Sequence, residues 1–453
     1  MAASSVTSVE TSTLVDSCRT KRVTKQRTCI IGAGAAGIAA AAALSRAGIE
    51  FDCFEAGSSP GGMWRYGNDS GYSAYASLRS NTIAENMQWF GFIPGGMRND
   101  YLGHQEVLGY LSEFLCHFGI MPHLRLATRV TRIQAMPGPA FEVDVQNFSG
   151  QKTHQYSTVI VATGRHAKPY IPDIRGLERA TYMHSCDYRT PDVFAGKRVA
   201  IVGFGASGVD IACDAAATAD YVALSTRYGG LVTPRYMDGH PTDSNPRSWA
   251  GRIPFFVRKQ IRNVTLRKWL ISPDYKGPGR PRSLSIDKPV VANDRLPELL
   301  GRGKVIVRPR IAEICGRSIT FEDGSAEDFD LVVFATGYET AFPFFPDQLL
   351  QQTAGFRDRY LRVIPAEPQG LFFIGQLSVA GPYFRVFEKQ ALWVADLIRG
   401  HCGLPSRDRL RHLATRESRV SSRRFKHAAQ PSDNVDYHSY MRSLDLAHRK
   451  RRG

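Results

Sequence analysis

Two glycine turns in this chain have the spacing that binds a phosphate-bearing ligand. They run from Gly32 to Gly37 and from Gly203 to Gly208, and both read G-x-G-x-x-G. Each turn follows a short apolar run and precedes a run of helix-forming residues, which is the strand–turn–helix context that makes the motif specific. In such a unit the backbone can approach a pyrophosphate closely, and the first amides of the helix face its negative charge. The sequence therefore predicts two dinucleotide sites.

The residues that follow the next strand distinguish the two ligands. Glu55 lies 21 residues after Gly34 and ends the apolar run 51–54, where an acid accepts the ribose hydroxyls of an adenosine that has no 2′-phosphate. The second unit has Ser225, Thr226 and Arg227 in that region, and these are donors suited to a 2′-phosphate. The first site fits NAD and FAD equally on this evidence, and the second site indicates NADP(H).

The remaining strands place these turns in a predicted α/β fold. Strand-like runs lie at 129–133, 141–145 and 158–162, and the last leads into Ala162-Thr163-Gly164. A run at 330–335 leads into a similar segment, Ala335-Thr336-Gly337. Small residues there let the chain pass tightly beside a nucleotide. One nucleotide unit opens the chain, a second interrupts it, and strands ending in glycine return, so we expect two Rossmann-like domains with the first split by the second.

The expected domain limits follow from changes in composition. Residues 1–26 are rich in Ser and Thr and form a disordered leader, with a transit peptide as the alternative. The first domain takes 27–170 and 331–447, and the second takes 171–330. Prolines break the periodicity from about 231 to 300, which indicates either a substrate-facing insert or a surface excursion. A basic tail closes the chain at 448–453.

Composition excludes several other classes of protein. The chain has 453 residues, of which 43% are hydrophobic, and no stretch resembles a membrane span, so we expect a soluble cytoplasmic protein. Eight scattered cysteines without C-x-x-C or metal-ligand spacing predict reduced thiols and no metal site. Of the net charge of +16, the segments 252–282 (9 basic against 1 acidic) and 401–453 (13 against 5) each carry +8. Neither contains a nucleic-acid motif, so solubility and attraction of anionic NADPH explain them.

Further motifs make the chain similar to a known family, the flavin-containing monooxygenases (class B flavoprotein monooxygenases). The resemblance covers roughly residues 28–447. It rests on both glycine turns and on Gly61-Gly62-Met63-Trp64, Tyr75-Ala76-Ser77-Leu78-Arg79-Ser80-Asn81, Phe334-Ala335-Thr336-Gly337-Tyr338, Phe372-Phe373-Ile374-Gly375 and Glu388-Lys389-Gln390-Ala391-Leu392-Trp393. The family pattern F-x-G-x-x-x-H-x-x-x-Y is kept only at His184 and Tyr188, since Glu178 and Ala180 replace its phenylalanine and glycine. We expect His184 and Tyr188 to brace the interdomain linker.

The resemblance implies an enzyme with FAD at the first site and NADPH at the second. NADPH would reduce the flavin, O2 would form a C4a-hydroperoxyflavin, and one oxygen atom would pass to a nucleophilic nitrogen or sulfur of a small organic substrate. It makes Asn81 the catalytic residue, places Ser207 and Asp210 beside the pyridine nucleotide, and assigns Arg227 to the 2′-phosphate. The full predicted set of cofactor-binding residues is Gly32, Gly34, Ala35, Ala36, Gly37, Glu55, Gly62, Met63, Trp64, Ser80, Asn81, Val130, Thr163, Gly164, Gly203, Gly205, Ser207, Gly208, Asp210, Ser225, Thr226, Arg227, Ala335, Thr336, Gly337, Gly375 and Gln376.

Other functions remain open at this point. A Baeyer–Villiger type monooxygenase would attack a ketone, and Tyr188 argues mildly against it. A flavin-bound NADPH oxidase or reductase would transfer no oxygen, although the absence of C-x-x-C disfavours a disulfide reductase. A flavin-bound redox sensor without turnover is the non-enzyme alternative. The expected partners are O2 and a small molecule that the sequence does not name, and a homodimer is left open.

Overall fold

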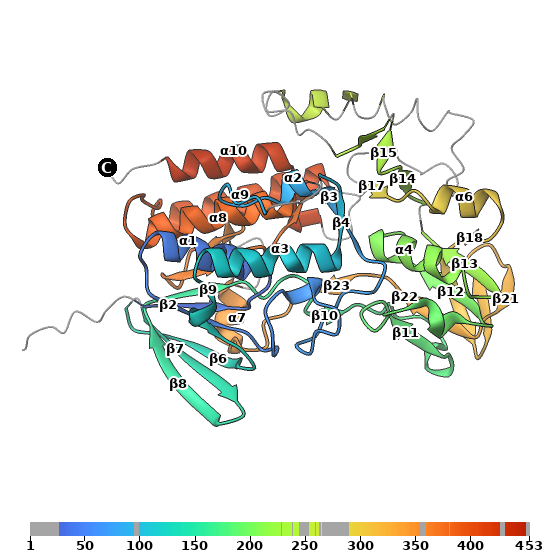
Figure 1. Ribbon diagram of the computed structural model, residues 1–453, viewed down its shortest axis with the longest axis horizontal. Coiled ribbons are helices and arrows are strands. Elements are labelled where there is room, and N and C mark those ends of the chain that lie inside the picture. Colours follow the sequence, from blue (N-terminus) through green and yellow to red (C-terminus); the bar gives the residue numbers. More distant parts are fainter. Residues whose placement is uncertain are drawn as a thin grey trace, which may run out of the picture.

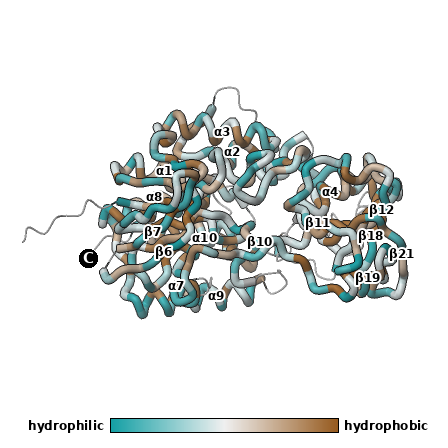
Figure 2. The backbone as a smooth tube through the Cα atoms, turned by 90° about the horizontal axis from the view of Figure 1, so that it is seen from below, coloured by the Kyte–Doolittle hydropathy of each residue, from teal (hydrophilic) through white to brown (hydrophobic). Residues whose placement is uncertain are grey.

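The computed structural model describes residues 27–94, 99–138, 140–227, 229–237, 239–243, 253–258, 260–261, 264, 290–353, 359–379, 381–425 and 431–449. The predicted leader, the last four residues of the predicted tail and most of the predicted insert lie outside this range. The described chain forms two lobes, each built on a five-stranded parallel sheet (Figures 1 and 2).

The first sheet has the strand order β5-β2-β1-β9-β26, and all neighbours in it are parallel. Its strands are β1 (Thr28–Ile31), β2 (Phe51–Phe54), β5 (Leu124–Arg125), β9 (Thr158–Val161) and β26 (Leu371–Phe373). Strands β1, β2, β9 and β26 are buried along their whole length, as expected for a parallel sheet covered on both faces. Successive residues point to opposite faces, so Ile30 packs in one core cluster and Ile31 in another.

Helices cover one face of this sheet and a meander covers the other (Figure 1). The helical side contains α1 (Ala35–Arg46), α3 (His104–His117), α8 (Tyr383–Ile398) and α10 (Tyr437–His448), with α9 (Arg407–Arg424) beside them. The meander consists of β6 (Arg129–Met136), β7 (Ala140–Asn147) and β8 (Gly150–Tyr156). The sheet is therefore held between two hydrophobic layers, and its edge at the carboxyl ends of the strands carries the first glycine turn.

The second sheet repeats this design with the order β18-β13-β12-β22-β11, again all parallel. Its strands are β11 (Tyr182–His184), β12 (Arg198–Val202), β13 (Tyr221–Ser225), β18 (Ile306–Arg308) and β22 (Leu331–Phe334). Helix α4 (Ala206–Ala215) packs on one face, and β19 (Ile311–Cys315), β20 (Ser318–Phe321) and β21 (Ala326–Asp328) lie against the other. The predicted α/β class with two Rossmann-like domains is confirmed.

One predicted boundary needs correction. We expected the first domain to resume at residue 331, but β22 pairs with β12 and β11 in the second sheet. The segment Ala335-Thr336-Gly337 is therefore the return of the second domain, and β26 is the strand that comes back to the first sheet, beside β9. The reason is that an apolar run shows that a strand is buried but does not show which strand lies next to it.

Short elements connect the two lobes. β10 (Lys168–Pro169) and β23 (Tyr338–Glu339) form an antiparallel pair between the lobes (Figure 1). The described part of the insert contains β14 (Leu231–Thr233) paired with β17 (Val290–Ala292), β15 (Tyr236–Met237) paired with β16 (His240–Pro241), and α6 (Leu296–Gly301). In the first lobe, β3 (Arg79–Ile83) pairs with β4 (Tyr101–Gly103), and α2 (Ala84–Met87) follows β3. None of the described helices is both long enough and apolar enough to cross a membrane.

Candidate cofactor sites

The first glycine turn is packed so tightly that side chains cannot replace two of its glycines. The Gly32 amide donates to the Phe54 carbonyl at 2.7 Å, and Gly32 has φ +98°, which side chains rarely adopt. A Cβ on Gly37 would lie 1.8 Å from the Gly32 carbonyl oxygen. A Cβ on Gly32 would lie 2.8 Å from the Ala162 oxygen, so the return after β9 passes directly against the turn.

The amides that begin α1 are available to an anion. Its N-cap residue is Gly34, no side chain caps the helix, and its first turn carries no acid. An uncapped helix start presents unsatisfied N–H groups and a partial positive charge. The segment Gly61-Gly62 lies on this turn, because the Gly61 amide donates to the Ala33 carbonyl at 2.9 Å and a Cβ on Gly62 would come within 2.9 Å of the Gly34 Cα. This is the cradle that a pyrophosphate requires.

Glu55 lies beside this cradle. Its side chain is almost fully buried, its Oε2 accepts the Ala33 amide at 2.7 Å, and its Oε1 accepts the Gly57 amide at 2.8 Å. Each carboxylate oxygen can accept more than one hydrogen bond, so both keep capacity for ribose hydroxyls. The Thr128 amide donates to the Glu55 carbonyl at 2.8 Å, which brings the start of β6, with Val130, next to the acid.

Two buried polar atoms near this cradle have no hydrogen-bond partner in the described chain. They are the Thr163 hydroxyl and the Gln376 Oε1, while the Gln376 Nε2 donates to the Gly164 carbonyl at 2.7 Å. The neighbouring Gly375 lies against α1, since a Cβ on it would be 2.9 Å from the Cβ of Ala36. Buried polar groups are nearly always satisfied. These atoms therefore fit a site for a polar ligand, and FAD fits the residues present.

The other predicted residues of this site lie on the same elements. Ala35 and Ala36 start α1, and Met63 and Trp64 are half-buried in the short 3-10 helix Gly62–Trp64 beside the turn.

The second glycine turn repeats the first in its geometry. The Gly203 amide donates to the Ser225 carbonyl at 3.0 Å, and Gly203 has φ +120°. A Cβ on it would lie 2.4 Å from the Ala335 oxygen, and one on Gly208 would lie 2.1 Å from the Gly203 oxygen. Helix α4 begins after Gly205 without a side-chain cap or an acid in its first turn. The second sheet thus carries its own anion cradle, with Ala335 in the place that Ala162 has in the first.

The strand ends next to the two turns differ as the sequence predicted, with one refinement. Phe54 pairs with Ile31 and Ser225 pairs with Val202, so the structural counterpart of Glu55 is Thr226. Ser225 is buried, and its hydroxyl donates to the Pro309 carbonyl at 2.7 Å. That hydroxyl is engaged inside the domain, which leaves half-buried Thr226 and exposed Arg227 as the donors expected for a 2′-phosphate.

The linker braces the return of the second domain. The Thr336 hydroxyl donates to the Tyr170 carbonyl, and the Gly337 carbonyl lies 3.1 Å from His184 Nε2. The Cys186 amide donates to His184 Nδ1 at 3.1 Å, so Nε2 carries the proton and donates to Gly337. Burial lowers the pKa of His184, which favours this neutral form. The bracing role expected for His184 agrees with these contacts.

Asp210 is engaged between the two domains. Its carboxylate accepts the Tyr75 hydroxyl at 2.8 Å and the Asn293 amide at 2.9 Å, and burial raises its pKa. Ser207 lies in the first turn of α4 and within reach of the same tyrosine. The carboxylate of Asp210 therefore joins the domains, and the contacts of Ser207 and Asp210 with the pyridine nucleotide stay predictions.

A second acid on α4, which no sequence motif indicates, extends this contact. Asp214 accepts the hydroxyls of Ser77 and Tyr188 and pairs with Arg295 at 2.9 Å. The partners are separated by up to 137 residues, so no local pattern could indicate them. Tyr188 thus packs in the core of the second domain and is bonded to α4.

Asn81 lies on a bulged strand. In the pairing of β3 with β4, Arg79 faces Gly103 and Ile83 faces Tyr101, so three residues of β3 bulge out between these pairs. Ser80 is buried and its hydroxyl donates to the Thr82 carbonyl at 2.7 Å, whereas Asn81 is exposed. The side chain of Asn81 has no hydrogen bond to the described chain. Bulges redirect side chains beside active sites, and this one presents an unengaged amide.

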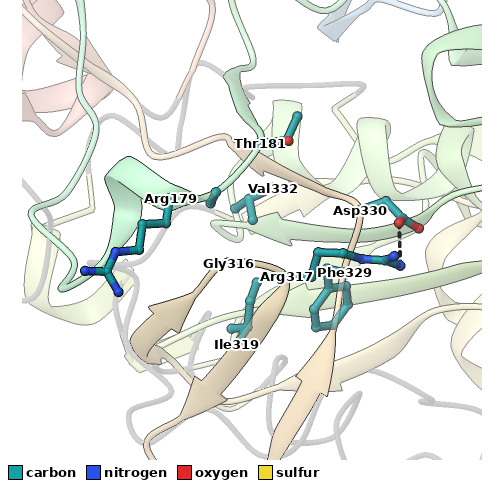
Figure 3. Close-up of a pocket in the computed structure, with 9 residues that line it drawn as sticks. Arg179, Thr181, Gly316, Arg317, Ile319, Phe329, Asp330 and Val332 are labelled. Carbon is teal, nitrogen blue, oxygen red and sulfur yellow. Dashed lines mark ion pairs between the residues drawn. The ribbon is translucent and has the colours of Figure 1, made fainter.

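A small cavity in the second domain is not part of these sites. It measures about 100 Å³ and lies among Arg179, Thr181, Gly316 and Asp330, near the ion pair of Arg317 with Asp330 at 2.5 Å (Figure 3). It is located at the amino ends of β11 and β22, whereas nucleotides bind at the carboxyl ends of parallel strands. It is also too small for a dinucleotide, because ligand pockets usually measure several hundred Å³, roughly 300–1,000 Å³.

Comparison with known proteins agrees with this geometry. The family described as flavin-binding monooxygenase-like matches residues 25–449. The chain is 32% identical over 409 residues to dimethylaniline monooxygenase [N-oxide-forming] 2 of Macaca mulatta, and 32% identical over 402 residues to human flavin-containing monooxygenase 1. Both alignments cover 84% of this chain and 75% of the relative.

Solved structures share the fold. S-allyl-L-cysteine S-oxygenase from Allium sativum superposes with a TM-score of 0.69 at 24% identity, over 94% of this chain and 89% of that one. A closed form of cyclohexanone monooxygenase superposes with a TM-score of 0.68 at 17% identity, over 93% and 97% of the two chains. These identities support the fold alone. The family match and the curated relatives decide the identity: the chain belongs to the flavin-binding monooxygenase-like family and is an FAD- and NADPH-dependent oxidoreductase.

Proposed function

We propose that this protein transfers one atom of O2 to a nucleophilic nitrogen or sulfur of a small organic substrate. The observation that carries the proposal is the pair of alike glycine turns with unlike strand ends, Glu55 at one and Thr226-Arg227 at the other, with the unengaged Asn81 amide on a bulge of the first lobe. For nitrogen, the proposal is supported by a relative named for forming N-oxides.

The chain's own groups bind and orient, since no nucleophile or general base is required. Bound FAD, once reduced by NADPH, supplies the oxygen-activating chemistry. The first turn and Glu55 would hold FAD, and the second turn with Thr226 and Arg227 would hold NADPH. The amide of Asn81 both donates and accepts, so it can hydrogen-bond to either kind of group on a bound cofactor or substrate.

The wild-type enzyme tests this proposal directly. Purified holoprotein is given NADPH and O2 with panels of tertiary amines, sulfides and ketones, while NADPH loss, H2O2 and oxygenated product are measured together. We expect amines or sulfides to yield close to one product molecule per NADPH. Product from ketones alone would replace the proposal with Baeyer–Villiger chemistry, and H2O2 without product from any panel would make the protein an oxidase.

Arg227→Ala is expected to weaken the binding of NADPH but not that of NADH. Loss of one charge-assisted contact to the 2′-phosphate should raise the KM for NADPH about tenfold. The KM for NADH, which lacks that phosphate, should change little. The matched control is Arg302→Ala, which removes another exposed arginine of the second lobe that pairs with Glu298. Equal changes for both coenzymes would contradict the role of Arg227.

Asn81→Ala is expected to uncouple NADPH oxidation from product formation. Without the amide, the bound cofactor or substrate loses a hydrogen-bond partner. We therefore expect the yield of product per NADPH to fall to less than about half, with H2O2 accounting for the rest of the NADPH consumed. Anaerobic reduction of the flavin should stay measurable. Asn147→Ala, at the turn between β7 and β8, serves as control. An unchanged yield would remove Asn81 from the reaction.

A further inference from the structure

The insert of the second lobe crosses back to the first and contacts it through Asp243. The Oδ2 of Asp243 accepts the Thr82 hydroxyl, the Ile83 amide at 3.2 Å and the Asn86 Nδ2 at 3.1 Å. The Asp243 carbonyl accepts the same Asn86 amide at 3.0 Å. One acidic residue is thus bonded to the end of β3 and to α2, about 160 residues earlier in the chain.

A second set of contacts connects the same insert to β4. The Asp243 amide donates to the Tyr101 hydroxyl at 3.1 Å, and this hydroxyl lies 3.2 Å from the Thr242 Oγ1. The Tyr236 hydroxyl donates to Asp100. The insert therefore forms hydrogen bonds with both strands of the β3–β4 pair or with residues directly next to them.

These contacts enclose the bulge that carries Asn81. Thr82 follows Asn81 in the chain, and Ile83 ends the bulge. Tyr101 is the residue of β4 that pairs with Ile83. Ser80, on the other side, is fixed by its own bond to the Thr82 carbonyl. Both neighbours of Asn81 are therefore held, and of Ser80, Asn81 and Thr82 only Asn81 has a side chain without a hydrogen bond to the described chain.

The carboxylate of Asp243 suits this position chemically. An ionised carboxylate only accepts hydrogen bonds, and all three groups around Oδ2 can donate. An amide of equal size could keep one oxygen for these three donors, but it would lose the negative charge. Charge-assisted bonds are also roughly twice as strong as neutral ones.

We propose that Asp243 is a positioning residue that fixes the Asn81 bulge from the insert of the NADPH-binding lobe. This inference rests on the proposed function for its catalytic consequence. Asp243 sets where the Asn81 amide lies, and a displacement of the insert moves that amide. The orientation of Asn81 is thereby coupled to the arrangement of the two lobes.

The first measurement needs no turnover. Hydrogen–deuterium exchange of the full-length protein, with and without added FAD, is followed in peptides that cover residues 79–87. In Asp243→Asn we expect these amides to exchange about tenfold faster, because the charge-assisted hydrogen bond of the Ile83 amide becomes a weaker neutral one, while peptides from β1 and β12 keep wild-type rates. Asp323→Asn, at an exposed turn where the carboxylate accepts from Ser325, is the matched control.

The second measurement compares how tightly NADPH oxidation is coupled to product formation in the variants. Asp243→Asn should release about threefold more H2O2 per NADPH than wild type, with a smaller change in the anaerobic rate of flavin reduction. Thr82→Val should show the same defect, Thr82→Ser should restore wild-type coupling, and Asp243→Asn with Thr82→Val should be no worse than Asp243→Asn alone.

The outcomes separate this inference from the proposed function. Wild-type exchange at 79–87 in Asp243→Asn would overturn the positioning role, as would faster exchange throughout the chain with all rates lowered equally, which indicates a general loss of stability. If wild type forms no oxygenated product but Asp243→Asn still loosens residues 79–87 selectively, the proposed function fails and the positioning role stands.

Discussion

Gly34→Ala is expected to give a folded protein that has lost its FAD and its yellow colour. The chain itself can accept this side chain. A Cβ on Gly34 would meet only the Gly62 Cα, at an ordinary 3.6 Å, and the residue has extended backbone angles, φ −75° and ψ −176°. The same Cβ would stand where the pyrophosphate approaches the turn. Overpacking costs about 1–3 kcal/mol, which corresponds to roughly 10- to 100-fold weaker FAD binding.

Absorbance of the purified protein at flavin and protein wavelengths measures this loss, and titration of the apoprotein with FAD gives the Kd. Circular dichroism and thermal melting check the fold. The control is Gly109→Ala on α3, where a Cβ meets no atom within 4 Å and FAD should be retained. Gly37→Ala could not serve here, because its clash with Gly32 at 1.8 Å would disturb the domain itself. A folded Gly34→Ala with full FAD content would remove the first turn from the flavin site.

Gly205→Ala is expected to keep FAD but to lose efficient reduction by NADPH. A Cβ on Gly205 meets no protein atom within 4 Å, and the residue has φ −98° and ψ 179°, so alanine fits the unliganded chain. The space it occupies lies at the uncapped start of α4, where the phosphates of NADPH would bind. We expect the Kd for NADPH to rise about 10- to 100-fold.

Stopped-flow reduction of the bound flavin at increasing NADPH concentration measures this effect, with dithionite as a control for a reducible flavin. Together the two glycine variants assign the sites independently. We expect Gly34→Ala to lose the flavin colour. We expect Gly205→Ala to keep the colour and to lose reduction of the flavin by NADPH. The reverse pattern would show that the cofactors are assigned to the wrong turns.

The features that the sequence determined by itself are local. Each strand, glycine turn and helix is complete within about 30 residues, and its glycines are needed by the unit's own backbone, as the 1.8 Å approach at Gly37 and the 2.1 Å approach at Gly208 show. The spacing from Gly34 to Glu55 is likewise fixed by one helix and one strand, so the acid beside the cradle could be predicted. The family resemblance relied on further short motifs, and the family match agrees with it.

Only the tertiary structure decided features that depend on packing between distant segments. It placed β22 in the second sheet, directed the Ser225 hydroxyl to Pro309, and engaged Asp210 with Tyr75, 135 residues away. It also placed Asp243 beside the Asn81 bulge. A buried strand does not specify its neighbour and a polar side chain does not specify its partner, because both are set by how the two lobes pack. The sequence thus defines the two cradles, whereas the contact between the lobes determines how Asn81 is held.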